Sequence, residues 1–340
     1  MKPLDPLDLT RRLVDIESLT YNEGAVGEYL DALLQERGFA VERTEVAQPL
    51  QSRYSGPRFN LYASYGERPE VVLSTHMDTV PPFISSSEDD LFLYGRGACD
   101  AKGIMAAQLA AVERLREAGV AAALLFVVGE ERDSAGAREA NLRPKGSRFL
   151  INGEPTDNRL ALASKGALRA EVRAHGTMAH SAYPELGDSA VHKLVRALDR
   201  LLDLELPHVE GIGSSTLNIG IIEGGRAPNV IADAASAAVL VRLVGPSQET
   251  RQAIEQAVAG LAEVEFTLEI PFIRMRQVEG LDTMVAAFTT DVPALTNWGE
   301  PLLLGPGSIH VAHTPFEKIA KKELLAAVDL YFELAQRLAG

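Results

Sequence analysis

Hydrophobic residues recur along the chain with two different spacings. In 9–16 and 23–37 they lie three and four positions apart, which predicts two amphipathic helices. The segments 71–75 and 121–128 are short, uninterrupted apolar runs, typical of strands buried on both faces, and a helix is expected between them at 102–118. Buried strands that alternate with helices predict an α/β domain whose mostly parallel sheet is covered by helices.

The pattern changes near residue 165. There the predicted elements follow the order βαββαβ, with strands at 168–174, 217–222, 235–244 and 265–270 and helices at 188–204 and 248–261. This order is that of a ferredoxin-like α+β domain, which is complete in itself. We therefore expect an inserted domain over 165–272 and a first domain made of 1–164 and 273–340, which closes on a helix over 315–338.

The composition excludes some partners. The chain of 340 residues carries 33 Lys and Arg against 47 Asp and Glu, a net charge of -14, and it has no basic run that would follow a phosphate backbone. Nucleic acid is not an expected partner. Cys99 is the only cysteine, and no apolar segment has the length or flanks of a membrane span or leader. We expect a cytoplasmic protein with no membrane association.

His76 and Asp78 follow directly on the apolar run 71–75. Residues two positions apart in a strand share one face. A neutral imidazole is the commonest metal ligand in proteins, and its second nitrogen needs a partner that fixes the tautomer, which Asp78 can supply. The pattern also fits a structural histidine at a strand end.

Asp100 lies in the glycine-rich turn 94–103, which leads into the predicted helix at 102. The turn does not match the G-x-G-x-x-G pattern of dinucleotide sites, because Asp100 stands at the third glycine position. We interpret Asp100 as a ligand placed where the backbone turns. Cys99, with no second cysteine near it, is interpreted as a buried thiol rather than a nucleophile.

Further candidate side chains also follow core segments. Glu130 and Glu131 come after the run 121–128, so one can bind a metal while its neighbour acts as general base, although a solvated acidic turn has the same pattern. Glu154 ends another apolar segment. His313 precedes Thr314–Glu317, which is typical of a helix start with a capping box. Capping explains Thr314 and Glu317 but not His313.

Two histidines and three carboxylates at the ends of core elements suit two divalent metal ions that share one carboxylate. Their order resembles the M20 family of zinc peptidases and amidohydrolases, which includes acetylornithine deacetylase, and the resemblance covers nearly the whole chain. It implies a ligand of one metal at His76, a ligand of the other at His313, a bridging Asp100, and a cis peptide bond after Asp100. It implies the remaining ligands Glu131 and Glu154, the general base Glu130, and the partner of His76, Asp78.

The resemblance also implies a lid and dimerisation domain at 165–272. His180 matches a lid histidine that donates to the oxyanion, in many dimers across to the partner's active site. Asn229 and Arg242 match residues that hold the substrate, and a planar guanidinium suits a carboxylate. From the residues alone, His180 would be interpreted as a loop histidine and Arg242 as a surface charge.

The expected function is hydrolysis of the amide bond of a small, carboxylate-bearing N-acyl amino acid, of the acetylornithine or acetyl-lysine kind, by metal-activated water. The expected cofactors are two divalent ions per chain, zinc or alternatively cobalt, and the expected assembly is a homodimer. A dipeptidase or aminopeptidase of the same family is the alternative. A metal-free binding protein would need a lost ligand, whereas all five ligands and the base are present.

Overall fold

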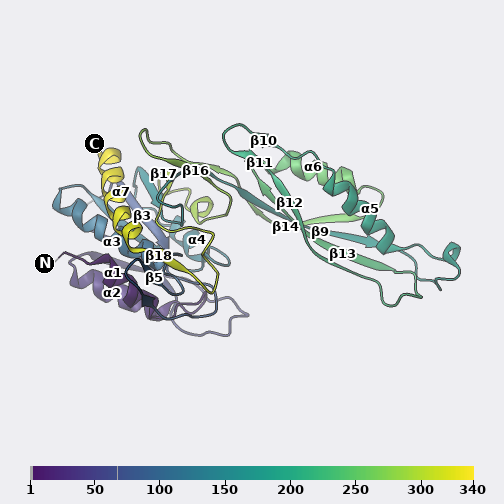
Figure 1. The fold of residues 1–340 in the computed structure, drawn as a ribbon, viewed down its shortest axis with the longest axis horizontal. Helices are drawn as coiled ribbons and strands as arrows, with labels where there is room; N and C mark the ends of the chain where they lie inside the picture. Colours follow the sequence, from purple (N-terminus) through teal and green to yellow (C-terminus); the bar gives the residue numbers. More distant parts are fainter. Residues whose placement is uncertain (1–2, 67) are drawn as a thin grey trace. The chain divides into compact units, whose positions relative to one another are not determined.

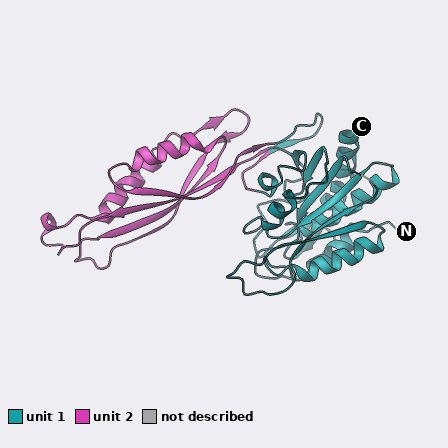
Figure 2. Cartoon of the chain, turned by 180° about the vertical axis from the view of Figure 1, so that it is seen from behind, with its two compact units in different colours: residues 1–162, 275–284, 290–340 teal, residues 163–274, 285–289 magenta. Residues whose placement is uncertain are grey.

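The computed structural model describes residues 3–66 and 68–340. The chain divides into two compact units (Figure 2). Unit 1 contains residues up to 162 together with 275–284 and 290–340, and unit 2 contains residues 163–274 and 285–289. Unit 2 is therefore inserted into unit 1.

Unit 1 is built on a six-stranded sheet with the order β1-β2-β6-β3-β7-β17 (Figure 1). The central strand β3 pairs in parallel with β6 and β7, β17 is parallel to β7, and β1 and β2 form an antiparallel edge. The strands are β1 (Ala40–Glu45), β2 (Phe59–Ser64), β3 (Val71–His76), β6 (Ala122–Val127), β7 (Phe149–Asn152) and β17 (Glu300–Leu303).

Both faces of this sheet are buried, which explains the continuous apolar runs. Leu73 and Phe126 point into one core, and Val72 and Leu125 point into a second core on the other face. The helices of unit 1 are α1 (Pro6–Val14), α2 (Gly24–Glu36), α3 (Lys102–Glu117), α4 (Ala135–Asn141) and α7 (Lys321–Ala339). Helices α1, α2, α3 and α7 supply the first core and α4 the second. The predicted α/β class is confirmed.

Unit 2 has the predicted βαββαβ order and forms an antiparallel sheet, β12-β13-β9-β14. Its elements are β9 (Gly166–His175), α5 (Ala190–Leu202), β12 (Thr216–Gly224), β13 (Ala234–Leu243), α6 (Ser247–Val258) and β14 (Glu263–Ile270). Leu194 of α5 and Ile254 of α6 share one core with Val239 of β13, so the two helices cover one face of the sheet. Shorter elements are η1 (Pro184–Leu186), β10 (His208–Val209) and β11 (Gly213–Ser214).

Two three-stranded sheets, and a two-stranded pairing of β10 with β11, complete the fold among the described residues. β8 (Leu160–Ser164) lies between β15 (Ile273–Arg274) and β16 (Thr283–Ala286), and a short 3-10 helix, η2, covers Val292–Ala294. In unit 1, β5 (Phe92–Tyr94) lies between β4 (Ser87–Glu88) and β18 (Lys318–Ala320).

The predicted start of the last helix is wrong. The helix α7 begins at Lys321, whereas we expected it at Pro315, and the three residues before it form β18. The Thr314 hydroxyl donates to the carbonyl of Val311 instead of capping a helix, and the Glu317 carboxylate accepts hydrogen bonds from the turn that carries Asp100. A capping box is a local pattern, and here its glutamate, Glu317, instead forms tertiary hydrogen bonds.

Candidate active site

His76 ends the central strand β3, and both of its ring nitrogens have partners. Nδ1 lies 2.9 Å from the backbone carbonyl oxygen of Asp78, and Nε2 lies 3.0 Å from Oδ1 of Asp100. Because a carbonyl oxygen can only accept, this contact favours the proton on Nδ1 and leaves Nε2 free to bind a cation. The Asp78 carboxylate lies farther away, with Oδ1 at 3.6 Å from Nδ1.

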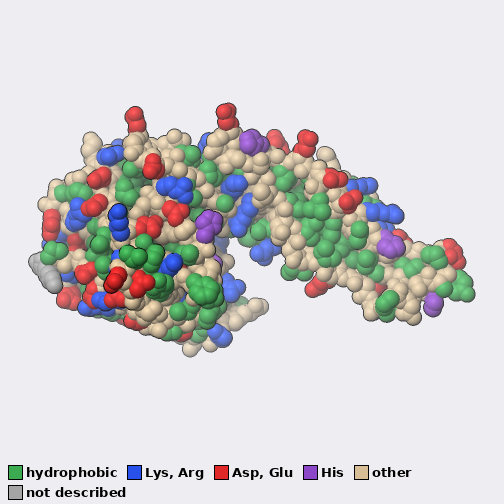
Figure 3. All heavy atoms as spheres, in the orientation of Figure 1, with side chains coloured by type: hydrophobic (Ala, Val, Ile, Leu, Met, Phe, Trp, Pro, Cys, Tyr) green, Lys and Arg blue, Asp and Glu red, His purple; other side chains and the backbone are tan. Residues whose placement is uncertain are grey.

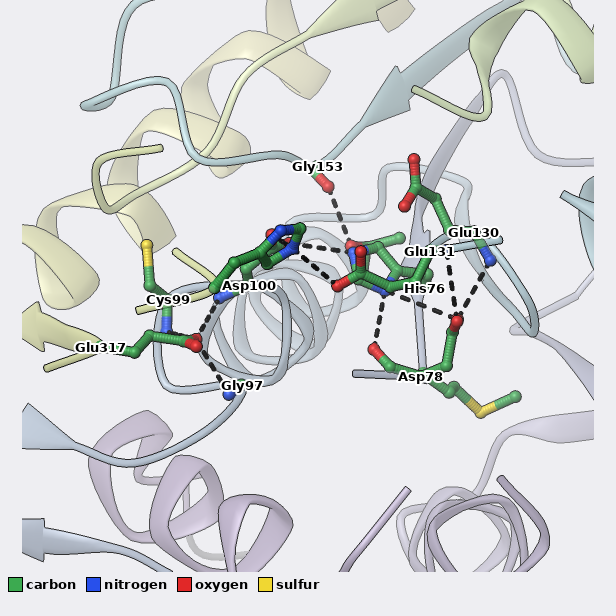
Figure 4. Close-up of polar contacts among 12 residues, drawn as sticks. His76, Asp78, Gly97, Cys99, Asp100, Glu130, Glu131, Gly153 and Glu317 are labelled. Atoms are coloured by element: carbon green, nitrogen blue, oxygen red, sulfur yellow. Dashed lines mark hydrogen bonds and ion pairs between the residues drawn. The ribbon is translucent and has the colours of Figure 1, made fainter. Parts of the chain in front are cut away.

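The Asp78 carboxylate instead holds the turn that follows β6. Its oxygens accept the backbone N–H groups of Gly129, Glu130 and Glu131 at 2.9, 3.1 and 3.3 Å, and the hydroxyl of Thr20 at 2.9 Å. Figure 4 shows the Glu130 and Glu131 side chains leaving this turn in different directions. One fully buried carboxylate therefore sets the positions of two neighbouring glutamates.

The proposed metal ligands form two groups that share one residue. The ligand atoms of His76, Asp100 and Glu154 lie within 4.8 Å of one another, and so do those of Asp100, Glu131 and His313. Asp100 belongs to both groups, so the two candidate metal sites adjoin. Its peptide bond to Ala101 is cis, as the family resemblance implied.

The chemistry of the first group fits a cation. Oε1 of Glu154 is buried and has no hydrogen-bond partner among the described residues. Burial, together with the charge of Asp100, raises the pKa of Glu154 well above its usual value. A buried carboxylate oxygen has lost its hydration, and a bound cation would compensate for that loss. A carboxylate and an imidazole nitrogen are donors that zinc and similar ions accept.

The second group lies at the edge of the site. Nε2 of His313 lies 3.0 Å from Oε1 of Glu131 and 3.3 Å from Oδ2 of Asp100, and these two carboxylates raise the pKa of His313 to about 10. The His313 side chain is 49% exposed. The first group thus sits in the interior, whereas the second opens toward solvent.

Glu130 lies on the same turn as Glu131 but belongs to neither group. It is partly buried, and burial together with the charge of Glu154 raises its pKa well above the usual value. A carboxylate with a raised pKa is a stronger base, and a base has to lie close to the reacting water rather than to be occupied as a ligand. Its position fits that role.

Two further buried carboxylates were missed by the sequence analysis. Oε1 of Glu317 accepts the N–H groups of Gly97, Cys99 and Asp100 at 2.9, 3.2 and 3.1 Å (Figure 4). Arg96 donates to Oε2 of the same carboxylate. Glu317 therefore holds the turn that presents the shared ligand. The only sequence signal was an acid four residues after His313, and capping explained it equally well.

The second missed carboxylate is Asp291, which immediately precedes η2 and is 1% exposed. Burial raises its pKa to about 7, and its charge in turn raises the pKa of Glu130 and of Glu154. More acidic side chains therefore surround His76 than the proposed metal ligands alone supply.

The candidate residues of unit 2 do not lie together. His180 is exposed, its Nδ1 accepts the N–H of Ala182 at 3.1 Å, and the next residue donates to the carbonyl of Asn229. His180 and Asn229 therefore lie on adjacent segments, before the Ala234 end of β13. Arg242 lies near the other end of that strand, eight residues from Ala234, which is about 26 Å along an extended chain.

These observations define a class: an α/β protein with two adjoining candidate metal sites and an adjacent base at the carboxyl ends of parallel strands. The peptidase dimerisation domain of the M20 family matches residues 162–267. A peptidase M20 domain-containing protein of Schizosaccharomyces pombe is 38% identical and aligns with 96% of this chain and 82% of its own length. A probable carboxypeptidase of Emericella nidulans is 39% identical over 96% of this chain and 88% of its own.

Solved structures agree in fold. A tripeptidase from Staphylococcus aureus superposes with a TM-score of 0.81 at 23% identity and covers 98% of this chain and 100% of its own. A dinuclear metal-binding peptidase of the M20 family from Bacillus subtilis has a TM-score of 0.69 at 17% identity and covers 98% and 97%. The chain belongs to the M20 peptidase family and is a hydrolase of peptide or amide bonds. The family resemblance noted in the sequence is confirmed.

No helix among the described residues combines the length and the apolar character that crossing a bilayer requires.

Proposed function

We propose that the protein hydrolyses the amide bond of a small N-acyl amino acid, with His76, Asp100, Glu131, Glu154 and His313 as the ligands of two divalent metal ions, zinc or cobalt. The observation that carries this proposal is that Asp100 is shared between two ligand groups while Glu130, on the same turn as Glu131, is left out of both. When bound, such ions supply Lewis-acid chemistry and stabilise developing negative charge.

The residues of the chain divide the remaining work. Glu130 takes the proton from the attacking water and delivers it to the leaving amine, which its raised pKa favours. Asp78 fixes the backbone from which the Glu130 and Glu131 side chains project. Glu317 fixes the backbone of Asp100 in the same way. The roles of the two neighbouring glutamates are therefore separable by mutation.

Substrate binding is assigned to Asn229 and Arg242. Arg242 is partly buried, which lowers its pKa, and it has no ion-pair partner among the described residues. A desolvated guanidinium without a carboxylate partner is poised for one from a ligand. This supports a substrate with a free carboxylate.

We further propose a homodimer formed through unit 2, in which His180 donates to the oxyanion in the partner's active site. The edge strand β12 exposes Ile221 and Ile222, and α5 exposes Val195 and Leu202. Figure 3 shows hydrophobic side chains gathered on this side of unit 2. An isologous pairing would cover the edge and these side chains. The distance between His180 and Arg242 along unit 2 supports their action at different active sites.

A dipeptidase or aminopeptidase is the second candidate, favoured by the similarity to a solved tripeptidase and to curated carboxypeptidases. The two functions differ in whether the substrate amine is acylated or free. Steady-state assays with acetylornithine, acetyl-lysine, other acetylated amino acids and a panel of dipeptides, each with added zinc or cobalt, separate them. We expect turnover of the acetylated compounds. Turnover of dipeptides with a free amine alone would overturn the deacetylase proposal and establish the peptidase.

A further inference from the structure

Unit 1 contains a pocket of about 520 Å³ that the proposed reaction does not use. Its walls include Thr20 and Tyr21 from the segment before α2, Arg53 and Tyr54 from the loop between β1 and β2, and Arg132. Small-molecule sites commonly have volumes of roughly 300 to 1,000 Å³. The pocket is therefore large enough to receive a substrate side chain or acyl group.

The pocket adjoins the active site through two direct connections. The hydroxyl of Thr20 donates to Oδ2 of Asp78 at 2.9 Å, the carboxylate that also holds the catalytic turn. Arg132 follows Glu131 on that turn, and its backbone N–H donates to the carbonyl of Gly129. Thr20 and Arg132 thus connect the pocket to the turn that carries Glu130 and Glu131.

The charge of the pocket is positive although the chain as a whole is acidic, with a net charge of -14. Of the described residues, its walls contain Arg53 and Arg132 and no Asp or Glu. Among the described residues neither arginine forms an ion pair, and Arg53 donates only to the hydroxyl of Tyr54, at 2.7 Å. Two unpaired guanidinium groups on one pocket favour an anionic ligand.

Two acids beside Tyr21 are paired with another arginine, Arg58. Arg58 is fully buried, with Nε 3.2 Å from Oε1 of Glu23 and Nη2 3.5 Å from Oδ1 of Asp133. Its guanidinium also lies over the ring of Tyr21, 5.0 Å from the centroid. Tyr21 therefore has this ion-pair network beside it, and Glu23 and Asp133 do not compensate Arg53 or Arg132.

We propose that this pocket binds a carboxylate of the substrate, in addition to the one assigned to Arg242, so that the preferred substrates are dicarboxylates. This inference rests on the proposed function and narrows it. The second carboxylate can come from an acidic side chain on the leaving amino acid or from a dicarboxylic acyl group. Acetylglutamate or a succinylated amino acid would then be a better substrate than acetylornithine, whose amine would face two arginines.

The test compares two isosteric pairs of substrates. Acetylglutamate against acetylglutamine probes the leaving side, and succinylalanine against its ω-amide probes the acyl side. For the wild-type protein we expect kcat/KM to be about tenfold or more higher for the acid than for the amide in one of the pairs. A charge-assisted hydrogen bond contributes a preference of this size. Arg132→Glu and Arg53→Glu should bring that ratio to about one or below.

Arg143→Glu is the matched control, because Arg143 is an exposed arginine of unit 1, 63% accessible and outside the pocket. It makes the same change in net charge and should keep the wild-type ratio. The inference is overturned if neither pair favours the acid, or if Arg143→Glu shifts the ratio as much as Arg132→Glu. Failure of the proposed function gives a different result, because then neither the acid nor its amide counterpart would be hydrolysed in either pair.

Discussion

The proposed catalytic residues of unit 1 and the candidate residues of unit 2 are held in opposite ways. Asp78 and Asp100 are both buried. The Asp78 carboxylate accepts hydrogen bonds from three backbone N–H groups, and the backbone N–H of Asp100 donates to Glu317. His180 and Asn229 are exposed and lie before the Ala234 end of β13, whereas Arg242 lies about 26 Å along the strand from Ala234. Unit 1 therefore assembles its site from its own tertiary contacts, whereas unit 2 presents separate surface residues.

This difference indicates where pre-organisation resides. A site held by buried hydrogen bonds has its geometry before substrate arrives. Residues that lie near opposite ends of β13 act on one substrate only if another surface completes the site. Mutations in unit 1 should therefore change metal content or chemistry within one chain, and mutations in unit 2 should show their effects through assembly.

The largest expected effect follows from removal of metal. Fully loaded protein should contain about two divalent ions per chain, because five ligands exceed the needs of one tetrahedral zinc. Chelation should abolish activity and lower the melting temperature, since the ions bind the folded state. Elemental analysis and calorimetry measure both. A single equivalent in fully loaded, active protein would contradict the shared role of Asp100.

The next effect separates neighbouring residues on one turn. Glu130→Gln should lower kcat by about 100- to 10,000-fold, as loss of a general base does, and leave metal content and melting temperature unchanged. Glu131→Gln is the matched substitution next to it and should lose metal. If Glu130→Gln released the metal and Glu131→Gln kept it, the two roles would be exchanged.

His180→Ala tests whether unit 2 acts across subunits. It should lower kcat by about 100- to 1,000-fold with a smaller change in KM, because an oxyanion donor acts mainly in the transition state. Mixing inactive Glu130→Gln protomers with His180→Ala protomers should then restore activity, since one site of each heterodimer has an intact base and donor. Ultracentrifugation checks assembly. A fully active monomer, or mixtures that stay inactive after verified subunit exchange, would show that His180 acts within its own chain or not at all.

The smallest effect concerns Glu317. Replacement by Gln removes the charge that accepts three backbone N–H groups around Asp100, so metal affinity should fall by about 10- to 100-fold, as for other residues that orient ligands. Metal titration followed by activity measures this. Glu323→Gln is a control on the following helix, because within the described part of the chain that carboxylate accepts only the N–H of Gly307. Equal losses in both variants would exclude a specific role for Glu317.

Several features were predictable because they depend on local pattern. The apolar runs at β3 and β6 predicted strands buried on both faces, and the spacing after residue 165 predicted the βαββαβ order. A residue that follows a strand lies at the end of that strand. His76, Asp78, Glu130 and Glu131 could therefore be expected together at the carboxyl ends of the strands. Their assignment to particular metals came from the family resemblance.

Other features could be decided only by contacts between distant segments. Glu317 lies 217 residues from Asp100 in sequence, and its local pattern described a helix cap equally well. Asp291 has no motif at all, and burial alone makes its charge matter to Glu130. The sequence by itself determines where strands end and which donors stand there. Tertiary packing decides which carboxylate faces a metal, which holds a turn, and which pKa rises, because these depend on burial and on neighbours that chain order does not specify.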